Sequence, residues 1–324
     1  MSILKGKSIL ITGGTGSFGR RFVKAVLAQH DPARIAVLSR DELKQYEMAQ
    51  ELGGDPRVRF FLGDVRDPER LWRAFDGIQV VVHAAALKQI PAVEYNPFEA
   101  IKTNINGAQN VIDAALDRQV ERVIALSTDK ASSPVNLYGA TKLVSDKLFV
   151  AANAYAGTKP TRFAVVRYGN VAGSRGSVIP LFRRLAPTKV LPITDERMTR
   201  FWITLDQGVG FVIDSLGRMR GGELFVPKLP SMRVVDMARA IAPDARLDIV
   251  GIRPGEKLHE QMIGPDDARR TLDAGTYFVI QPDADWWADA VEAGSTPVPE
   301  GFHYSSDTNT WWLSVEELRQ IADA

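Results

Sequence analysis

Cysteine does not occur among the 324 residues of the chain. Its absence excludes disulfides, zinc–thiolate sites and thiol nucleophiles, and it fits the cytoplasmic location that we predict. No stretch approaches the roughly 20 apolar residues of a membrane helix, and we expect the apolar N-terminal run to be a strand and not a signal peptide. The formal net charge is only +1, so we expect neither nucleic acid nor a membrane as a partner. We also predict no metal site.

The first part of the chain alternates apolar runs with segments of helical spacing. The runs typical of buried strands are residues 7–14, 33–40, 58–65, 79–86, 122–128 and 161–171. The helical segments are residues 18–30, 68–77, 96–119 and 133–156. This alternation predicts the α/β class, with a doubly wound parallel sheet and helices on both of its faces.

The alternation loosens after residue 172, where glycine-rich loops, short strands and short helices follow. We therefore predict a dinucleotide-binding domain at residues 1–172 and a smaller substrate-binding lobe at residues 173–324, whose segments can interleave with the first domain. The lobe should pack at the carboxyl ends of the strands, where open α/β sheets bind ligands.

A glycine turn, TGGTGSFG, follows the first predicted strand and precedes the first predicted helix. Its glycines suit a tight turn, close approach of the backbone to a pyrophosphate and close helix–strand packing. This context predicts a Rossmann-like dinucleotide site, although an ordinary glycine-rich turn is the alternative. The predicted contacts in the turn are Gly13, Thr15, Gly16, Ser17, Phe18 and Gly19.

The end of the second predicted strand indicates which dinucleotide binds. It carries Ser39, Arg40 and Asp41, with Lys44 one helical step later. A guanidinium and an ammonium favour the 2′-phosphate of NADP, unless they are only solvated charges at a helix start. Asp64 is a candidate adenine contact or a helix cap. The other predicted cofactor contacts are Val65, Ala84, Ala85, Ala86, Tyr138, Lys142 and Val171.

Tyr138 and Lys142 are four residues apart on a predicted helix and therefore share one face. A tyrosine with its usual pKa of about 10 is a poor base at neutral pH. The charges of Lys142 and of an oxidised nicotinamide should lower the pKa of Tyr138. Lys142 can also hold the nicotinamide ribose, and Thr128 can hydrogen-bond a substrate hydroxyl. The alternative is an ordinary pair on a helix surface.

Seven motifs extend this pattern: SRDELKQ, GDVRD, HAAALKQIPAVEYNP, LSTDKASSPVNLYGATK, RYGNVAGSRGSVIP, MTRFWITLDQG and GIRPGEKLHE. With them the chain resembles the extended short-chain dehydrogenases/reductases that act on nucleotide sugars. Within these it is similar to the inverting UDP-N-acetylglucosamine 4,6-dehydratases, of the soluble type that opens pseudaminic acid biosynthesis. The resemblance implies bound NADP, UDP-N-acetylglucosamine as substrate, and a homo-oligomer, either a dimer or a hexamer.

The resemblance also implies a role for Asp129 and Lys130, which directly follow Thr128. After oxidation of C4, Lys130 would remove the C5 proton and Asp129 would protonate the departing C6 hydroxyl. The retaining dehydratases carry Asp–Glu here, so the lysine marks the inverting type. Lys130 must be neutral to act as a base, which predicts a depressed pKa. The alternative is a mutually neutralising pair on an exposed loop.

Substrate contacts are carried over from the resemblance, and arginine's planar fork suits the UDP diphosphate. They are Lys88, Asn104, Asn170, Arg175, Arg200, Arg253 and Tyr304. Any one of the arginines could equally form a surface ion pair.

Two other functions fit parts of the pattern. A nucleotide-sugar 4-epimerase would share the glycine turn and the Tyr–Lys pair but would not need Asp129 and Lys130. A non-catalytic NADP-sensing regulator could use the same fold, but such proteins typically lose the Tyr–Lys pair, which this chain keeps.

Overall fold

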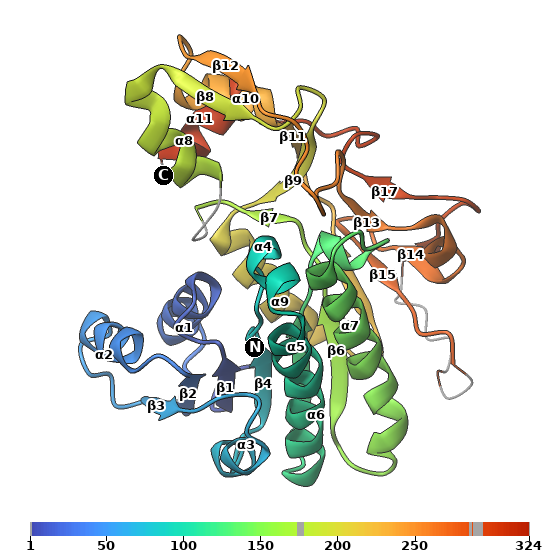
Figure 1. Cartoon of the computed structure of the whole chain (residues 1–324). Helices are drawn as coiled ribbons and strands as arrows, with labels where there is room; N and C mark the ends of the chain where they lie inside the picture. The colour runs from blue at the N-terminus through green and yellow to red at the C-terminus, as the bar shows by residue number, and fades with distance from the viewer. Residues whose placement is uncertain (1, 174–177, 285–286, 288–293, 324) are drawn as a thin grey trace.

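The computed structural model describes residues 2–173, 178–284, 287 and 294–323. Within these residues the centre is a ten-stranded sheet, in which seven neighbouring strands run parallel. Their spatial order is β3 (Val58–Leu62), β2 (Arg34–Ser39), β1 (Ser8–Thr12), β4 (Val80–His83), β5 (Arg122–Leu126), β6 (Arg162–Val166) and β10 (Leu224–Pro227). The predicted parallel sheet of the α/β class is confirmed (Figure 1).

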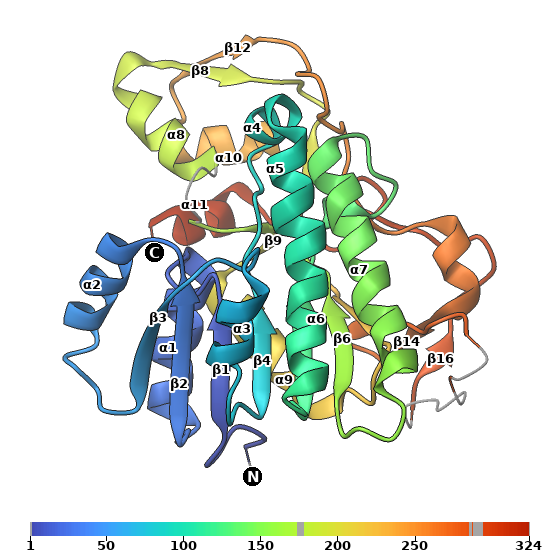
Figure 2. The ribbon, with the colours of Figure 1, turned by 60° about the horizontal axis from the view of Figure 1, so that its bottom comes forward.

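Helices cover both faces of this sheet (Figure 2). One face carries α1 (Ser17–Gln29) and α9 (Leu205–Arg218), and the other carries α3 (Pro68–Ala74), α6 (Gly107–Asp117) and α7 (Leu137–Ala156). Helices α2 (Glu42–Glu51) and α4 (Ile90–Tyr95) follow β2 and β4. The sheet is therefore doubly wound, as the alternating pattern predicts.

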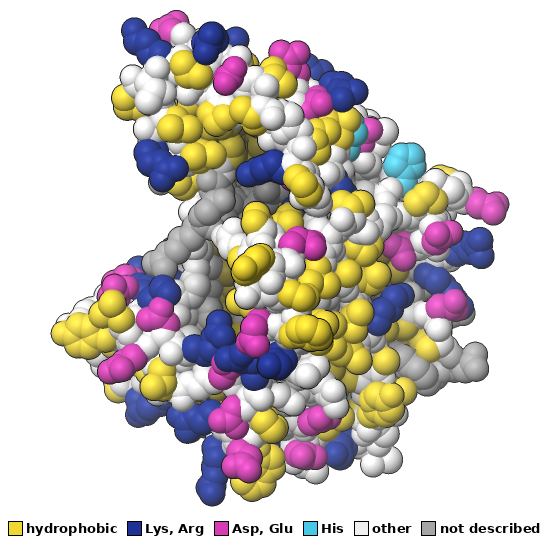
Figure 3. Space-filling view, in the orientation of Figure 1, with side chains coloured by type: hydrophobic (Ala, Val, Ile, Leu, Met, Phe, Trp, Pro, Cys, Tyr) yellow, Lys and Arg dark blue, Asp and Glu magenta, His cyan; other side chains and the backbone are white. Residues whose placement is uncertain are grey.

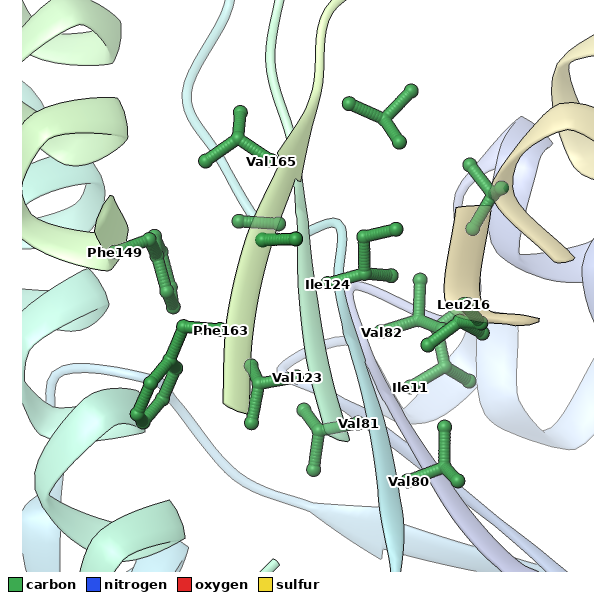
Figure 4. Packing of buried hydrophobic residues seen from close by; sticks show 14 of the residues in the cluster. Ile11, Val80, Val81, Val82, Val123, Ile124, Phe149, Phe163, Val165 and Leu216 are labelled. Atoms are coloured by element: carbon green, nitrogen blue, oxygen red, sulfur yellow. The ribbon is translucent and has the colours of Figure 1, made fainter. Parts of the chain in front are cut away.

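The core lies on both faces of the sheet because successive side chains of a strand point in opposite directions. Figure 4 shows Val81 on the side of Phe149 from α7, whereas Val82 lies on the side of Leu216 from α9. All four side chains are fully buried. Burial of one such side chain contributes about 1.5–3 kcal/mol to folding, so this core holds the strand ends firmly in place.

The long helix predicted before β5 is interrupted. It consists of α5 (Pro97–Ile101), a π-helical turn (Lys102–Asn106) and then α6. Asn104 lies in the π turn, where its amide nitrogen donates to the Leu87 carbonyl (2.9 Å) and to the Thr141 hydroxyl (3.0 Å). Its Oδ1 accepts from the Leu87 N–H at 2.8 Å. Such bulges in helices are frequent at functional sites.

A smaller lobe with its own hydrophobic core lies at the top of Figure 1. It consists of α8 (Val178–Leu185), α10 (Val234–Ile241), α11 (Val315–Asp323), β8 (Val190–Ile193) and β12 (Arg246–Ile249). Smaller sheets lie between this lobe and the large sheet (Figure 1). One consists of β7 (Asn170–Val171), β9 (Thr199–Ile203) and β11 (Ser231–Arg233). Another pairs β13 (Gln261–Ile263) with β17 (Tyr304–Ser305).

The part of the chain after residue 172 contributes to both regions. Helix α9 and strand β10 belong to the large sheet, together with β14 (Thr271–Asp273), β15 (Tyr277–Ile280) and β16 (Thr296–Pro297). The division into domains at residue 172 stays a prediction. The strand predicted over residues 161–171 is split, because β6 ends in the large sheet and β7 pairs with β9 instead. No helix in the described part of the chain is long and apolar enough to cross a membrane.

Candidate active site

A cleft of about 990 Å³ lies at the carboxyl ends of the parallel strands. It is lined by the turns that follow β1, β2, β4 and β5, by the start of α7, and by Arg253 from the second half of the chain. Figure 3 shows the surface hollowed between the smaller lobe and the rest of the molecule. This is the edge at which doubly wound sheets bind ligands.

The glycine turn forms one end of the cleft. Gly13 has a φ of +64°, and a Cβ there would lie 2.8 Å from the Ala85 nitrogen. A Cβ at Gly19 would lie 2.3 Å from the Gly14 carbonyl oxygen. Larger residues would therefore fill the turn or push helix α1 away from β1. The free backbone and the N-terminus of α1 fit the diphosphate of a dinucleotide.

All the residues predicted to contact the cofactor line this cleft. At the end of β2, Arg40 lies in the cleft with its Nη1 3.5 Å from Oδ2 of Asp64. Lys44 pairs with Asp41, whose carboxylate also accepts from the Lys44 N–H at 3.0 Å as the N-cap of α2. Two cations, each beside a carboxylate, therefore lie in the cleft at the end of β2.

Asp64 is not a helix cap, because Asp67 caps α3 instead. Asp64 accepts from the Arg66 backbone N–H at 3.0 Å and from its guanidinium at 2.7 and 2.9 Å. Burial would raise the pKa of Asp64, but these bonds and the charge on Arg40 lower it. The carboxylate therefore stays ionised at the cleft wall, where it can accept a hydrogen bond.

Tyr138 and Lys142 lie on the first turns of α7 and face the cleft, so the alternative of a surface pair is wrong. Both side chains are buried. Burial raises the pKa of Tyr138 to about 12, although the charge on Lys130 works against this rise. The sequence predicts a pKa of Tyr138 below its usual value, whereas the structure places this pKa above it. The cation that favours the phenolate here is Lys130.

A buried cluster lies beneath Lys142. Asp146, one further turn along α7, accepts from the Ser127 hydroxyl at 2.6 Å and from Nη2 of Arg167 at 3.3 Å. Burial lowers the pKa of Lys142, and the Asp146 carboxylate opposes this effect. The guanidinium of Arg167 also donates to the Met262 carbonyl at 2.8 Å. The cluster therefore joins β5, β6 and α7 to β13 under the reactive side chains.

Asp129 and Lys130 form a 3₁₀ turn directly after β5, capped by Thr128. Asp129 is 1% exposed, so the alternative of an exposed loop pair is wrong. Nζ of Lys130 lies 3.0 Å from Oδ1 of Asp129 and 3.0 Å from Oε1 of Glu260. The Thr128 hydroxyl donates to Oδ1 of Asp129 at 2.9 Å. Thr128, Asp129, Lys130 and Tyr138 line the cleft together.

The protonation state of Lys130 differs from the sequence prediction. Burial alone would lower the pKa of Lys130, but the Asp129 and Glu260 carboxylates raise it above its usual value. The prediction of a depressed pKa is therefore wrong for the protein alone. The physical reason is Glu260, a carboxylate from far along the chain. It ends the quoted motif GIRPGEKLHE, but the motif alone does not indicate that its last residue reaches Lys130.

Three of the predicted substrate contacts line the cleft: Lys88, Asn170 and Arg253. Burial, followed by the charge on Lys130, lowers the pKa of Lys88. Arg253 is bound to Glu256, with its Nε 3.0 Å from Oε2. Arg175 lies outside the described residues.

The other three predicted substrate contacts do not line the cleft. Asn104 instead holds the loop at Leu87, which places Lys88. The guanidinium of Arg200 donates to the backbone carbonyls of Thr199, Leu258 and Lys257. The Tyr304 hydroxyl donates to the Leu229 carbonyl at 3.0 Å and accepts from the Leu229 N–H at 2.7 Å. Asn104 and Arg200 thus hold segments beside the site, whereas Tyr304 holds Leu229, which is not among the described residues that line the cleft.

Several lining residues have no signal in the sequence that assigns them to the site. They include Gln89, Ile90, Pro91, Thr103, Ser127, Tyr168, Leu205, Pro254 and Glu256. Tyr168 is the most informative of them, since it is buried beside Tyr138 and its pKa is raised by that burial. In the sequence it lies inside the strand predicted over residues 161–171, where nothing distinguishes it from a core residue.

The chain matches the model of the family described as "Polysaccharide biosynthesis protein" over residues 9–282. It is 56% identical over 324 residues to a protein from Campylobacter jejuni named UDP-N-acetylglucosamine 4,6-dehydratase (inverting), with 97% of each chain covered. It is 38% identical to a UDP-glucose 4-epimerase from Rickettsia canadensis, which covers 97% of this chain and 95% of the relative.

Solved structures show the same architecture. The X-ray structure of Pen from Bacillus thuringiensis superposes with a TM-score of 0.91 at 36% identity and covers 98% of each chain. DesIV, a dTDP-glucose 4,6-dehydratase from Streptomyces venezuelae with NAD and TYD bound, gives a TM-score of 0.69 at 26% identity, over 78% of this chain and 86% of that one. The chain therefore belongs to the polysaccharide biosynthesis protein family, as an extended short-chain dehydrogenase/reductase related to the inverting UDP-N-acetylglucosamine 4,6-dehydratases.

Proposed function

We propose that the chain is a UDP-N-acetylglucosamine 4,6-dehydratase that inverts C5, and therefore a hydro-lyase. Its product would be UDP-2-acetamido-2,6-dideoxy-β-L-arabino-hexos-4-ulose, the first intermediate of pseudaminic acid biosynthesis. The observation that carries the proposal is the buried Asp129–Lys130 pair beside Tyr138 in one cleft. A homo-oligomer, either a dimer or a hexamer, and a cytoplasmic location stay predictions from the resemblance and the composition.

The first chemical step needs a base at the C4 hydroxyl, and we assign this role to Tyr138, which lines the cleft. A nicotinamide dinucleotide held at the glycine turn would supply the hydride acceptor for C4 and later the hydride donor for C6. Thr128 can orient the hydroxyl, and the charged Lys130 favours the phenolate of Tyr138. The C4 ketone that results makes the hydrogen on C5 acidic.

The ion pair of Lys130 and Asp129 can provide both groups that the elimination needs. A proton that moves from Nζ to the carboxylate across 3.0 Å leaves a neutral amine and a carboxylic acid. The amine then takes the C5 proton, the acid protonates the C6 oxygen, and the C6–O bond breaks to release water. The pair ends in its starting ionic form. The raised pKa of Lys130 is thus compatible with its role as a base, because the proton stays within the pair.

The proton from Lys130 would arrive at Oδ1 of Asp129, whereas the other oxygen of this carboxylate, Oδ2, is buried and hydrogen-bonds to no group in the described part of the chain. A buried acceptor without a partner costs about 1–3 kcal/mol. Oδ2 is not exposed to the cleft, so a substrate hydroxyl would reach it only after the packing around Asp129 changes.

Incubation of the purified protein with UDP-N-acetylglucosamine tests the proposed function. We expect a product lighter by one water, detected by mass spectrometry, with the L-arabino configuration in the NMR spectrum. A 4-epimerase, which the relatives of that name make the second candidate, would give a product of unchanged mass. An NADP-sensing regulator would leave the sugar unchanged.

We propose that the cofactor is NADP. The support is that Arg40 and Lys44 line the cleft at the end of β2, where their charges would favour a 2′-phosphate. Arg40→Asp should weaken NADP binding roughly 10- to 100-fold, since a charge-assisted hydrogen bond contributes about 1.5–3 kcal/mol. Titration of cofactor-free protein with NADP and NAD measures the change. The exposed Arg73, outside the cleft, gives the control Arg73→Asp. A wild type that prefers NAD would contradict this assignment.

A further inference from the structure

The Lys130 ammonium is held between two carboxylates and not only beside Asp129. Oε1 of Glu260 lies 3.0 Å from Nζ, and so does Oδ1 of Asp129. The side chains of Glu260 and Asp129 are 3% and 1% exposed, so water screens neither contact well. Glu260 is not among the described residues that line the cleft. Its ion pair with Lys130, which does line the cleft, links it to the site.

The backbone of Glu260 is fixed by a segment near the C-terminus. Its N–H donates to the Ser306 hydroxyl at 2.9 Å, and its carbonyl accepts from the Ser306 N–H at 2.8 Å. The Ser306 hydroxyl lies 2.7 Å from the Thr199 hydroxyl on β9. Strand β13 starts at the next residue and pairs with β17. The Glu260 carboxylate thus contacts Lys130 from a separate part of the fold, in which hydrogen bonds hold the backbone in place.

Several charged or titratable groups face Lys130 from the surrounding elements. They are Asp129 on the same turn, Tyr138 on α7, Lys88 after β4, Arg200 on β9, and Lys257 and Glu260 before β13. Nε of Arg200 lies 3.7 Å from Oε1 of Glu260, and Nζ of Lys257 donates to the Ser132 carbonyl at 2.6 Å. The cations Lys88, Arg200 and Lys257 disfavour the charge on Lys130, and the two carboxylates outweigh them.

We propose that Glu260 is a positioning residue for the dehydration. Its carboxylate holds the Lys130 ammonium against Asp129. It also sets the pH range in which the Asp129–Lys130 pair carries a single proton, which the base and the acid share. This inference rests on the proposed function. It adds a residue from the second half of the chain to the proton transfer at C5 and C6.

The sign of the effect follows from charge alone. The pair is inactive with two protons, because the base is then blocked, and with none, because the acid is then lost. A nearby anion favours the protonated forms, so Glu260 raises the pH of both limits. Removal of its charge should move the whole active range to lower pH, by about one to three units for an opposite charge at this distance.

The test compares pH profiles of the dehydration rate for the holoenzyme and two variants. Glu260→Gln keeps the shape and removes the charge, so both limits should move to lower pH. Glu260→Asp keeps the charge and shortens the side chain. Its rate at the optimum should fall, but its pH range should stay closer to that of the wild type. Thermal melts and cofactor retention check that each variant is folded.

A second measurement keeps the test valid if Glu260→Gln does not fold. In wild-type protein labelled with ¹³C at lysine Cε, the Lys130 resonance, assigned with Lys130→Met, should stay that of an ammonium throughout the neutral range. A neutral Lys130 there would overturn the proposal, and so would a folded Glu260→Gln with an unmoved pH profile. A wild type that releases no water from UDP-N-acetylglucosamine would instead refute the proposed function.

Discussion

Tyr138→Phe should lower the dehydration rate roughly 10²- to 10⁴-fold, which is the usual contribution of a positioned acid–base group. The fold and the cofactor should be kept, because only the hydroxyl is removed from a ring that stays buried. Burial holds the pKa of Tyr138 at about 12 even beside the charge on Lys130, so the phenolate is a minor form at neutral pH. The proposed reaction therefore needs the hydroxyl to lose its proton as the hydride leaves C4.

The rate of water loss, measured beside a thermal melt, checks this result. Tyr155→Phe is the matched control, since Tyr155 lies on the same helix and is 74% exposed. It should leave the rate unchanged. A Tyr138→Phe enzyme with near wild-type turnover would remove Tyr138 from the mechanism.

The ionic form of Lys130 has opposite effects in the two halves of the reaction. As a cation it lowers the pKa of Tyr138 and so favours oxidation at C4. As a neutral amine it can accept the C5 proton. Transfer of its proton to Asp129, 3.0 Å away, changes the pair from the first form to the second. The close grouping of Tyr138, Asp129 and Lys130 therefore suits a reaction in two stages.

Most strands of the large sheet could be predicted, because runs of neighbouring apolar residues in the sequence indicate them. The run VVVH of β4 is buried at every residue, and such continuous apolar runs are typical of parallel strands covered by helices. The π turn at Lys102–Asn106 could not be predicted, because helical spacing continues through it. Asn104 lies in this turn, and its amide forms hydrogen bonds to Leu87 and Thr141. These are tertiary contacts, which the local sequence pattern does not show.

The position of the candidate site in the fold could be predicted where its residues follow strands directly. The glycine turn, Arg40 and the Asp129–Lys130 turn all lie at strand ends, so topology brings them to one edge. Glu260 could not be found in this way, because its position depends on hydrogen bonds with Ser306. Arg200 and Tyr304 carry polar groups that suit a ligand. In the structure these groups bind backbone carbonyls instead, through tertiary contacts that the sequence does not show.

Lys130→Met should stop the elimination, with a loss of at least about 10²-fold, because a thioether cannot accept a proton. Oxidation at C4 should become slower, because Lys130 is the cation that favours the Tyr138 phenolate, but it should not stop. The 4-keto sugar that keeps its C6 hydroxyl should therefore still form in a single turnover. Asp129→Asn should slow water loss as well, because an amide is a poor acid. Lys147→Met, at an exposed lysine of α7, is the control and should keep the wild-type rate.

Loss of Lys130 also leaves two buried carboxylates without their shared cation, which can cost about 3–5 kcal/mol. Stability must therefore be measured alongside activity, and an isotope experiment on the wild type gives a test that does not depend on any variant. In D₂O, deuterium should enter at C5, because that hydrogen comes from solvent or from an exchanged side chain. The hydrogen that arrives at C6 comes from C4 and should carry no solvent label. A product with the D-xylo configuration at C5, or a Lys130→Met enzyme of unchanged rate, would contradict the role of the Asp129–Lys130 pair as the acid and base of the elimination.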